Sequence, residues 1–311
     1  MKYFIPICLL AVATVSACET VVQVKLPTHE ARLVAHSLFV PDSLWRVNVS
    51  TTAPSTGFQE PGFVDDAVVE IWDGDRRVER LAPIGQGTYT SASNRPEPEK
   101  TYTLRVSAPE MGQSEGTGAV PPAARIAAFE QQIADEDTGG DFGRRIMRIL
   151  LTVDDPPGVR NYYGLQVLQD RRVINNATGE ITSLPRNTFT FASNDPALGE
   201  PDVFNPDKTT YKETIFSDDL FDGRPHTIDF ELEYTLDRRE TDVKIERSFV
   251  VLFMTVSTDY FDYWKTSELQ NTVGDNPFAE PVRVHSNMTG GLGIFAGYRA
   301  HAFPLADSTA F

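Results

Sequence analysis

The stretch GGLGIFAGYRAHAF, residues 290–303, decides between two fold classes for this chain. Read from Gly291, it fits G-x-G-x-x-A, a variant of the glycine fingerprint that holds a dinucleotide pyrophosphate. That fingerprint works at a strand–turn–helix, with an acidic residue about 20 positions further on. Residues 294–303 read as a strand, and the acidic partner is missing. We therefore expect no nucleotide here, but a last strand that Gly290, Gly291 and Gly293 enter through positive φ or close backbone approach.

Strand patterns also dominate the region before this stretch. HTIDFELEYTL (226–236) and DVKIERSFVVLFMTVS (242–257) are the clearest, because they are long and rich in β-branched and aromatic residues. ARIAAFEQQIA and RRIMRILLTVDD read as two strands joined through an acidic, glycine-bearing hairpin, and NYYGLQVLQD and RRVINN follow them. The polar, turn-rich residues 176–208 read as long loops.

One helix is predicted, at TDYFDYWKTSELQNTV (258–273). Thr258 or Asp259 can cap it, and Tyr260, Tyr263 and Trp264 recur at helical spacing. An aromatic stripe at this spacing is more typical of a core contact than of a ligand platform.

Residues 30–108 read as about seven short strands broken by turns. ARLVAHSLFV, WRVNVSTT, DAVVEIW and TYTLRVSA are the main ones, and Asp73-Gly74 is a hairpin turn. Pro121-Pro122 marks a boundary, since prolines are excluded from central strands. We predict a mainly β protein with two β-sandwich domains, at 30–119 (immunoglobulin-like or transthyretin-like) and 120–311, and one short helix near the C-terminus.

The opening MKYFIPICLLAVATVSACET is typical of a secretory signal peptide over residues 1–17. Its apolar run is too short to span a bilayer. Cys18 follows a small residue, as in a bacterial lipobox, and Cys8 is lost on cleavage, so no intramolecular disulfide can form. We predict lipidation, including palmitate, at Cys18, with 18–29 as a short tether. Two or more acyl chains anchor a protein stably in a membrane.

The charge excludes one class of partner. The formal net charge is −16 and the pI is about 4.7. Nucleic-acid binding depends on Lys and Arg that neutralise phosphates, so no nucleic acid is expected.

Motifs for catalysis and metal binding are weak. His285 and His301 bracket the glycine turn and could meet across a hairpin, but no HxxxH or HExxH occurs, and we expect no metal site and no cofactor. Residues 135–146 depart from a calcium loop at two ligand positions. Asp154-Asp155 before two prolines is better suited to organising a turn than to acid–base chemistry. G-x-S-x-G is absent, so no catalytic residues are assigned and no enzyme is expected.

The predicted loops are the place where binding residues are most often found. Phe189, Phe191 and Phe204 lie among Asn, Asp and Pro in the 176–208 region. If exposed, they could stack on a sugar or peptide, and they could equally cover the sheet.

Several blocks together carry a family resemblance. The most specific blocks are NPFAEPVRVHSNMTGGLGIFAGY (276–298) and VDDPPGVRNYYGLQV (153–167). Four further blocks occur in the order found in the family: ARLVAHSLFVPDS, DAVVEIWDGD, TYTLRVSAP and FSDDLFDGR. With them the chain resembles the DUF4249 family of Bacteroidetes outer-membrane lipoproteins. The resemblance implies β-sandwich domains and a place beside TonB-dependent transporters, and transfers no catalytic residue.

The function expected from these observations is that of a lipid-anchored binding or accessory component of the outer membrane, serving a TonB-dependent transporter in nutrient uptake. A structural or adhesive surface lipoprotein is the main alternative. A hydrolase is a third, and it needs titratable residues that converge in a pocket.

Overall fold

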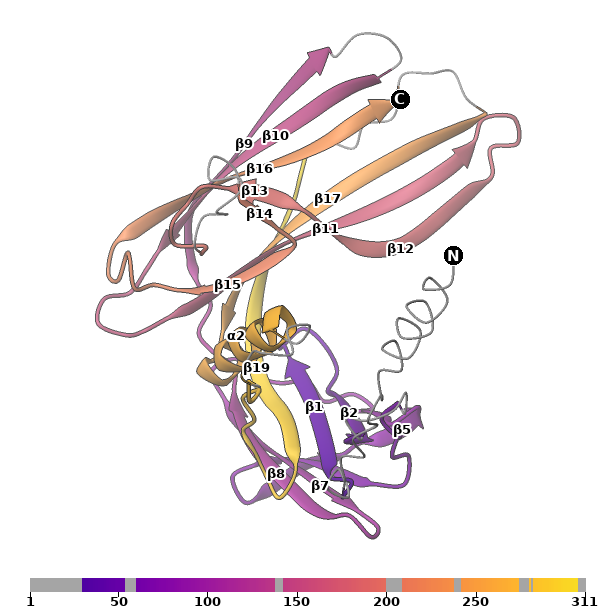
Figure 1. The fold of residues 1–311 in the computed structure, drawn as a ribbon, viewed down its shortest axis with the longest axis vertical. Helices are drawn as coiled ribbons and strands as arrows, with labels where there is room; N and C mark the ends of the chain where they lie inside the picture. The colour runs from indigo at the N-terminus through magenta and orange to yellow at the C-terminus, as the bar shows by residue number, and fades with distance from the viewer. Residues whose placement is uncertain are drawn as a thin grey trace, which may run out of the picture. The chain divides into compact units, whose positions relative to one another are not determined.

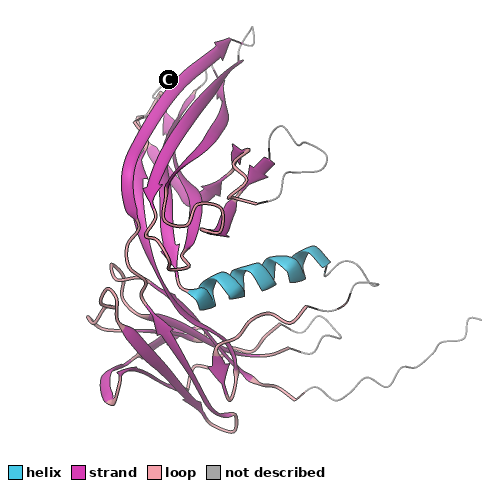
Figure 2. Cartoon of the chain, turned by 90° about the vertical axis from the view of Figure 1, so that its left-hand side faces the viewer, coloured by secondary structure: helices cyan, strands magenta, loops and turns pink. Residues whose placement is uncertain are grey.

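The computed structural model describes residues 30–53, 60–137, 142–199, 209–237, 242–273, 280 and 282–306. Strands dominate these residues, as Figure 2 shows in magenta. The N-terminal strands are β1 (Leu33–Phe39), β2 (Arg46–Thr51), β3 (Val68–Asp73), β4 (Arg76–Arg80), β5 (Ala82–Gly85), β6 (Thr88–Thr90), β7 (Thr101–Ala108) and β8 (Gly112–Ala119). The later ones are β9 (Arg125–Asp137), β10 (Phe142–Asp154), β11 (Tyr162–Asn175), β12 (Ile181–Phe189), β13 (Phe191–Ser193), β14 (Thr209–Tyr211), β15 (Glu213–Ser217), β16 (Pro225–Asp237), β17 (Val243–Val256), β18 (Met288–Thr289) and β19 (Leu292–Pro304).

Three sheets form two sandwiches. A nine-stranded sheet has the order β12-β11-β17-β19-β1-β2-β6-β5, with β15 added to β11. Its β12–β19 part packs on the sheet β14-β13-β16-β10-β9 around a buried cluster that includes Ile149, Val167 and Phe253, the C-terminal core. Its β1–β5 part packs on the sheet β18-β8-β7-β3-β4 around Trp45 and Leu104, the N-terminal core. The predicted mainly β sandwich fold is confirmed.

Strand β19 takes part in both sandwiches (Figure 1). Its residues 292–297 pair in parallel with 34–39 of β1, and its residues 298–304 pair antiparallel with 250–256 of β17. Phe295 is fully buried in the N-terminal core, whereas Phe303 packs against the C-terminal core. The predicted boundary between 119 and 120 stays a prediction; the structure adds that the N-terminal sandwich contains a strand from the far end of the sequence.

The predicted helix is confirmed as α2 (Thr258–Val273). Its expected cap at Thr258 or Asp259 is wrong by one or two residues. Ser257 is the cap, because its carbonyl accepts from Phe261 N–H at 3.0 Å and its Oγ accepts from Tyr260 N–H at 3.4 Å. The aromatic stripe packs on Ile294 and Ala296 of β19, so it is a core contact as predicted.

The interpretation of residues 176–208 as long loops is wrong for residues 181–189 and 191–193, which are strands, and holds for the turns at 176–180 and 194–199. Strand β12 pairs with β11 along most of its length, and β13 joins β14 and β16. Strand β12 is the edge of its sheet and its side chains are mostly exposed. The polar residues of β12 therefore reflect its place as an exposed edge strand, not a loop. Residues 200–208 lie outside the described part of the chain.

Candidate functional site

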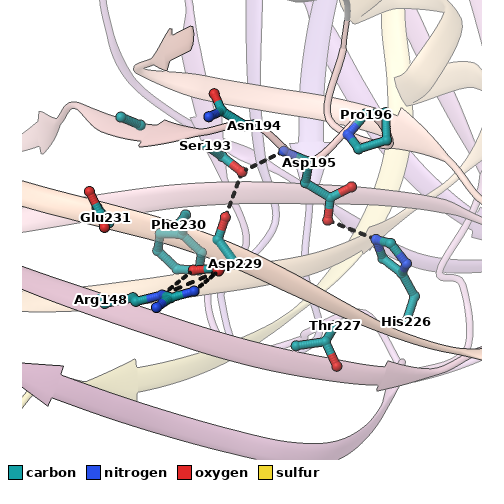
Figure 3. Close-up of a pocket in the computed structure, with 11 residues that line it drawn as sticks. Arg148, Ser193, Asn194, Asp195, Pro196, His226, Thr227, Asp229, Phe230 and Glu231 are labelled. Atoms are coloured by element: carbon teal, nitrogen blue, oxygen red, sulfur yellow. Dashed lines mark hydrogen bonds and ion pairs between the residues drawn. The ribbon is translucent and has the colours of Figure 1, made fainter. Parts of the chain in front are cut away.

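An open cleft of about 600 Å³ lies along β16 in the C-terminal sandwich (Figure 3). Strand β10 contributes Arg148, and β16 contributes residues 226, 227 and 229–231. The end of β13 and the turn after it contribute residues 192–196. Strand β13 pairs with β16 at a single position, Ala192 opposite Glu231, and the chain then turns away, which leaves room for the cleft.

One wall of the cleft carries an ion pair. The Arg148 Nε donates to both carboxylate oxygens of Asp229, at 2.9 and 3.2 Å, and the Nη2 adds a third bond. This hydrogen-bonded pairing raises the pKa of Arg148. The two side chains are about half exposed, so the pair contributes little to stability. Its effect is to hold a guanidinium and a carboxylate in fixed positions at the mouth of the cleft.

The opposite wall carries a histidine–carboxylate pair. The His226 Nε2 lies 2.8 Å from Asp195 Oδ2, and the other oxygen of Asp195 accepts from Ala197 N–H at 2.9 Å. The His226 ring stacks on Phe221 with centroids 4.4 Å apart. The side chain of Asp195 is only 6% exposed. Its carboxylate and the Phe221 ring together hold the imidazole of His226 in one orientation.

Ser193, between these two pairs, determines what chemistry the cleft can perform. Its Oγ donates to the Asp229 carbonyl at 2.6 Å and accepts from Asp195 N–H at 3.1 Å. A serine nucleophile needs its hydroxyl proton directed at a histidine. Here the hydroxyl proton is given to a backbone carbonyl. The cleft therefore contains the three residue types of a hydrolase without the hydrogen bond that joins serine to base.

A second cleft, of about 730 Å³, lies on the N-terminal sandwich across β3, β7, β8 and the turn before β19. Arg105 there binds Glu115 at 2.6 Å, and its guanidinium lies 4.5 Å from the Trp72 ring. Gly290 lines this cleft, but residues 292–304 continue as strand β19. The predicted strand is confirmed, and the helix that a pyrophosphate site requires does not follow the glycines.

The three predicted turn glycines lie where β19 enters the N-terminal sandwich. Gly290 and Gly293 have φ values of 79° and 118°, a region that disfavours side chains. A Cβ on Gly290 would lie 2.3 Å from the Gln113 carbonyl oxygen, and one on Gly291 would lie 2.6 Å from Ser114 Oγ. The two features that the sequence predicts for this turn, positive φ and close approach of neighbouring atoms, are therefore both present.

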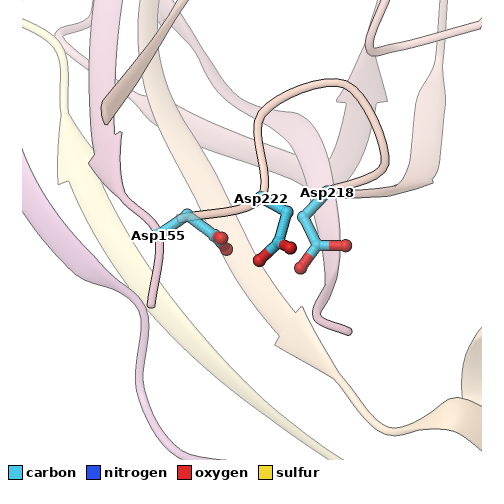
Figure 4. A group of neighbouring side chains, drawn as sticks. All are labelled: Asp155, Asp218 and Asp222. Carbon is cyan, nitrogen blue, oxygen red and sulfur yellow. The ribbon is translucent and has the colours of Figure 1, made fainter. Parts of the chain in front are cut away.

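A group of carboxylates joins the loop after β10 to the loop after β15 (Figure 4). Oxygens of Asp155, Asp218 and Asp222 lie within 4.8 Å of one another. Such oxygens are calcium ligands by type. Each carboxylate, however, accepts a backbone N–H from the neighbouring loop, with distances of 2.7–2.9 Å. The arrangement ties residues 155–161 to 218–224.

Within this group, Asp155 also accepts from the Tyr163 hydroxyl at 2.6 Å, in a position that is only 3% exposed. Burial raises the pKa of Tyr163, and the bond to Asp155 adds to the shift. Burial, together with the nearby charge of Asp155, raises the pKa of Asp218. Asp155 thus organises its turn, as the sequence suggests. Asp218 and Asp222 were missed, because nothing in the sequence shows that two distant loops meet.

The remaining predicted residues lie apart. Phe191 is 1% exposed in the C-terminal core, and Phe189 packs edge-on against Phe249 at 5.0 Å. Their rings are occupied by the core, which does not support ligand stacking. His285 binds Asp259 and His301 binds the Ala124 carbonyl, so the two histidines do not meet. Phe204, the centre of the acidic hairpin and Cys18 lie outside the described residues.

These features define a mainly β protein of two packed sandwiches with polar clefts on its strands. The family model for DUF4249, a domain of unknown function, matches residues 19–302, and the chain belongs to that family. No curated protein matches the sequence. Within the described residues, no helix has the length and apolar character of a membrane span.

Two of the solved structures that resemble this chain are distant likenesses. The major pilin subunit BcpA of Bacillus cereus is 10% identical over 72% of this chain and 65% of its own, with a TM-score of 0.19. The B domain of a biofilm-associated protein is 7% identical over 87% of this chain and 85% of its own, also with a TM-score of 0.19. At these scores neither likeness informs the function of this chain.

Proposed function

We propose that this chain is a binding component held at the outer membrane by lipid on Cys18, and that it serves a TonB-dependent transporter in nutrient uptake. The observation that carries the binding role is the cleft on β16. Its charged groups are fixed by hydrogen bonds on paired strands, and an arrangement of this kind recognises polar ligands with little loss of conformational entropy.

Binding is favoured over hydrolysis by the hydrogen bonds inside the cleft. The Ser193 hydroxyl donates to a backbone carbonyl, and His226 uses its Nε2 for Asp195. A relay would need both groups turned toward each other. The groups at the mouth, Arg148 and Asp229, instead offer a donor and an acceptor side by side.

The experiment that tests this role is a mild-detergent pull-down of the tagged protein from its own outer membrane, followed by mass spectrometry. A stoichiometric TonB-dependent barrel supports the proposal, and deletion of this chain should then reduce uptake of the barrel's substrate. Recovery of the protein alone, or in a lattice of its own copies, refutes the transporter role and favours the structural or adhesive alternative.

A pair of variants separates the cleft from the anchor. The double substitution Arg148→Ala with Asp229→Ala removes the fixed ion pair at the mouth. We expect uptake to fall while membrane attachment is unchanged. The matched control is Arg105→Ala with Glu115→Ala, which removes the equivalent exposed pair from the second cleft. Equal losses in both variants would show that the cleft on β16 has no special role.

A further inference from the structure

One layer of the C-terminal sandwich interior is rich in arginine. Arg171 of β11 and Arg247 of β17 are directly opposite each other in the antiparallel register. In the facing sheet, Arg145 of β10 is directly opposite Tyr234 of β16. The Arg247 guanidinium carbon lies 5.7 Å from the centroid of the Tyr234 ring, which links the two pairs across the sandwich. We call these four residues the arginine layer.

The alternation of the strands places this layer on the inner face. Val167 of β11 and Met147 of β10 are fully buried in the C-terminal core. Residues an even number of positions away point to the same side of a strand, so Arg171 and Arg145 continue the inner face. In agreement, Arg145 is 9% exposed and Tyr234 is 7% exposed. The arginine layer is therefore the next layer of the sandwich interior beyond the apolar core.

Arg171 has an unsatisfied donor within this layer. Its Nε is enclosed by protein and has no hydrogen-bond acceptor. Arg145 and Arg247 each have a further partner, whereas no ion pair of Arg171 is seen with the described residues. A buried donor without an acceptor is costly, and like charges directly opposite in a sheet are destabilising. The chain has 44 Asp and Glu residues, yet among the described residues no carboxylate forms an ion pair with Arg171.

We propose that the arginine layer binds a small oxyanion, with its oxygens accepting from the two Nη groups of Arg171 and its charge offsetting the charge of Arg171. A carboxylate or a phosphate group fits, because the planar fork of arginine matches two oxygens of either. The net charge of −16 repels long polyanions, so the ligand is a small molecule rather than a nucleic acid. This site is separate from the cleft on β16.

The test uses the complete mature protein in detergent, with inorganic phosphate and succinate as probes in calorimetric titrations at constant ionic strength in chloride. Saturable binding of at least one probe is expected. Arg171→Met should weaken it about tenfold or more, because one or two charge-assisted hydrogen bonds are lost. The control is Arg172→Met, at the exposed next position on the opposite face, which should bind as the wild type does. Binding of neither probe, or equal losses in both variants, overturns the proposal.

Two further measurements keep the result interpretable. In chloride alone, the thermal midpoint of Arg171→Met should equal or exceed that of the wild type, because a buried donor without an acceptor is removed. If Arg171→Met does not fold, Arg171→Lys keeps the charge without the fork and should still bind more weakly. Unweakened binding by Arg171→Lys would then overturn the proposal. Binding of phosphate without succinate assigns the ligand to phosphate compounds, and binding of succinate assigns it to carboxylates.

Discussion

Gly293 approaches Ala35 so closely that a Cβ on Gly293 would lie 1.9 Å from the Ala35 carbonyl oxygen. The two residues are register partners where β19 pairs in parallel with β1. The φ of Gly293 is 118°, which side chains rarely adopt. The entry of β19 into the N-terminal sandwich therefore depends on the absence of a side chain at this position.

We expect Gly293→Ala to lower the free energy of unfolding by about 3 kcal/mol or more, since it adds a clash with backbone to an unfavourable φ. Urea unfolding followed by tryptophan fluorescence measures this loss. The control is Gly112→Ala, at φ 81° with no atom within 4 Å of the added Cβ. It should cost about 1 kcal/mol, from the backbone conformation alone. Similar losses in the two variants would mean that the close approach to Ala35 is unimportant.

The carboxylate of Asp155 should be a second point of high sensitivity. It accepts from the Tyr163 hydroxyl and from Gly223 N–H at a buried position. Asp155→Ala leaves both donors without an acceptor, and we expect a loss of about 3 kcal/mol or more. Tyr163→Phe removes one donor and should cost about 1–2 kcal/mol. Denaturant unfolding of both variants and the double variant gives the coupling energy, which should be clearly non-zero.

Asp154→Ala is the matched control for that series. Asp154 is the neighbouring carboxylate, at the end of β10, and it is half-buried. Its substitution should change stability by no more than about 0.5 kcal/mol. A large loss in Asp154→Ala, or a small one in Asp155→Ala, would contradict the assignment of the loop contacts to Asp155.

Long elements with strong local patterns could be predicted from the sequence. Helix α2 has the predicted bounds, and β7 also coincides with its predicted stretch, in which buried positions recur with a period of two. Strand β8 was missed because GQSEGTGA has little β propensity. Its Gly116 and Gly118 are explained only by neighbours from the far end of the chain, Met288 and Phe295.

The sites were harder to predict than the elements. The cleft on β16 brings Arg148, Asp195 and His226 together from three parts of the chain. The arginine layer depends on register, because moving one strand by one residue would turn its arginine to the outer face. Neither the register of paired strands nor the order of strands in a sheet can be predicted from the composition of single segments. Phe191 shows the converse, since its polar surroundings in sequence left both exposure and a sheet contact open, and it is buried in the core.

Lipidation at Cys18 stays a prediction, and Cys18→Ser tests it directly. We expect the variant to lose incorporation of a labelled palmitate analogue and to move from the membrane fraction to the soluble one. The reason is that acyl chains supply the attachment, at roughly 0.8 kcal/mol for each buried CH₂. Cys8→Ser, in the predicted signal peptide, is the control and should label and fractionate normally. Membrane retention of unlabelled Cys18→Ser would point to attachment through a protein partner.

Glu213 predicts a pH dependence of stability. This half-buried carboxylate lies on β15, where Gln166 is its hydrogen-bonding neighbour at 3.4 Å and its charge acts on Tyr260 and Tyr298. Burial raises the pKa of Glu213 above the ordinary 4.5. The folded protein therefore binds this proton more strongly than the unfolded chain does. The resulting stability is fully present below pH 4.5 and is lost as the pH rises through the raised pKa.

Glu213→Gln removes this titration while keeping an acceptor for Gln166. At pH 7 we expect the variant to unfold at a higher urea concentration than the wild type, because no charge is held in the half-buried site. Below pH 4.5 the two midpoints should converge, since the wild-type carboxyl is then protonated and neutral. The control is Glu268→Gln, at an exposed position of α2. Its urea midpoint should equal that of the wild type both at pH 7 and below pH 4.5. A Glu213→Gln variant that is less stable at pH 7 would show that the carboxylate is favourably solvated in the folded protein.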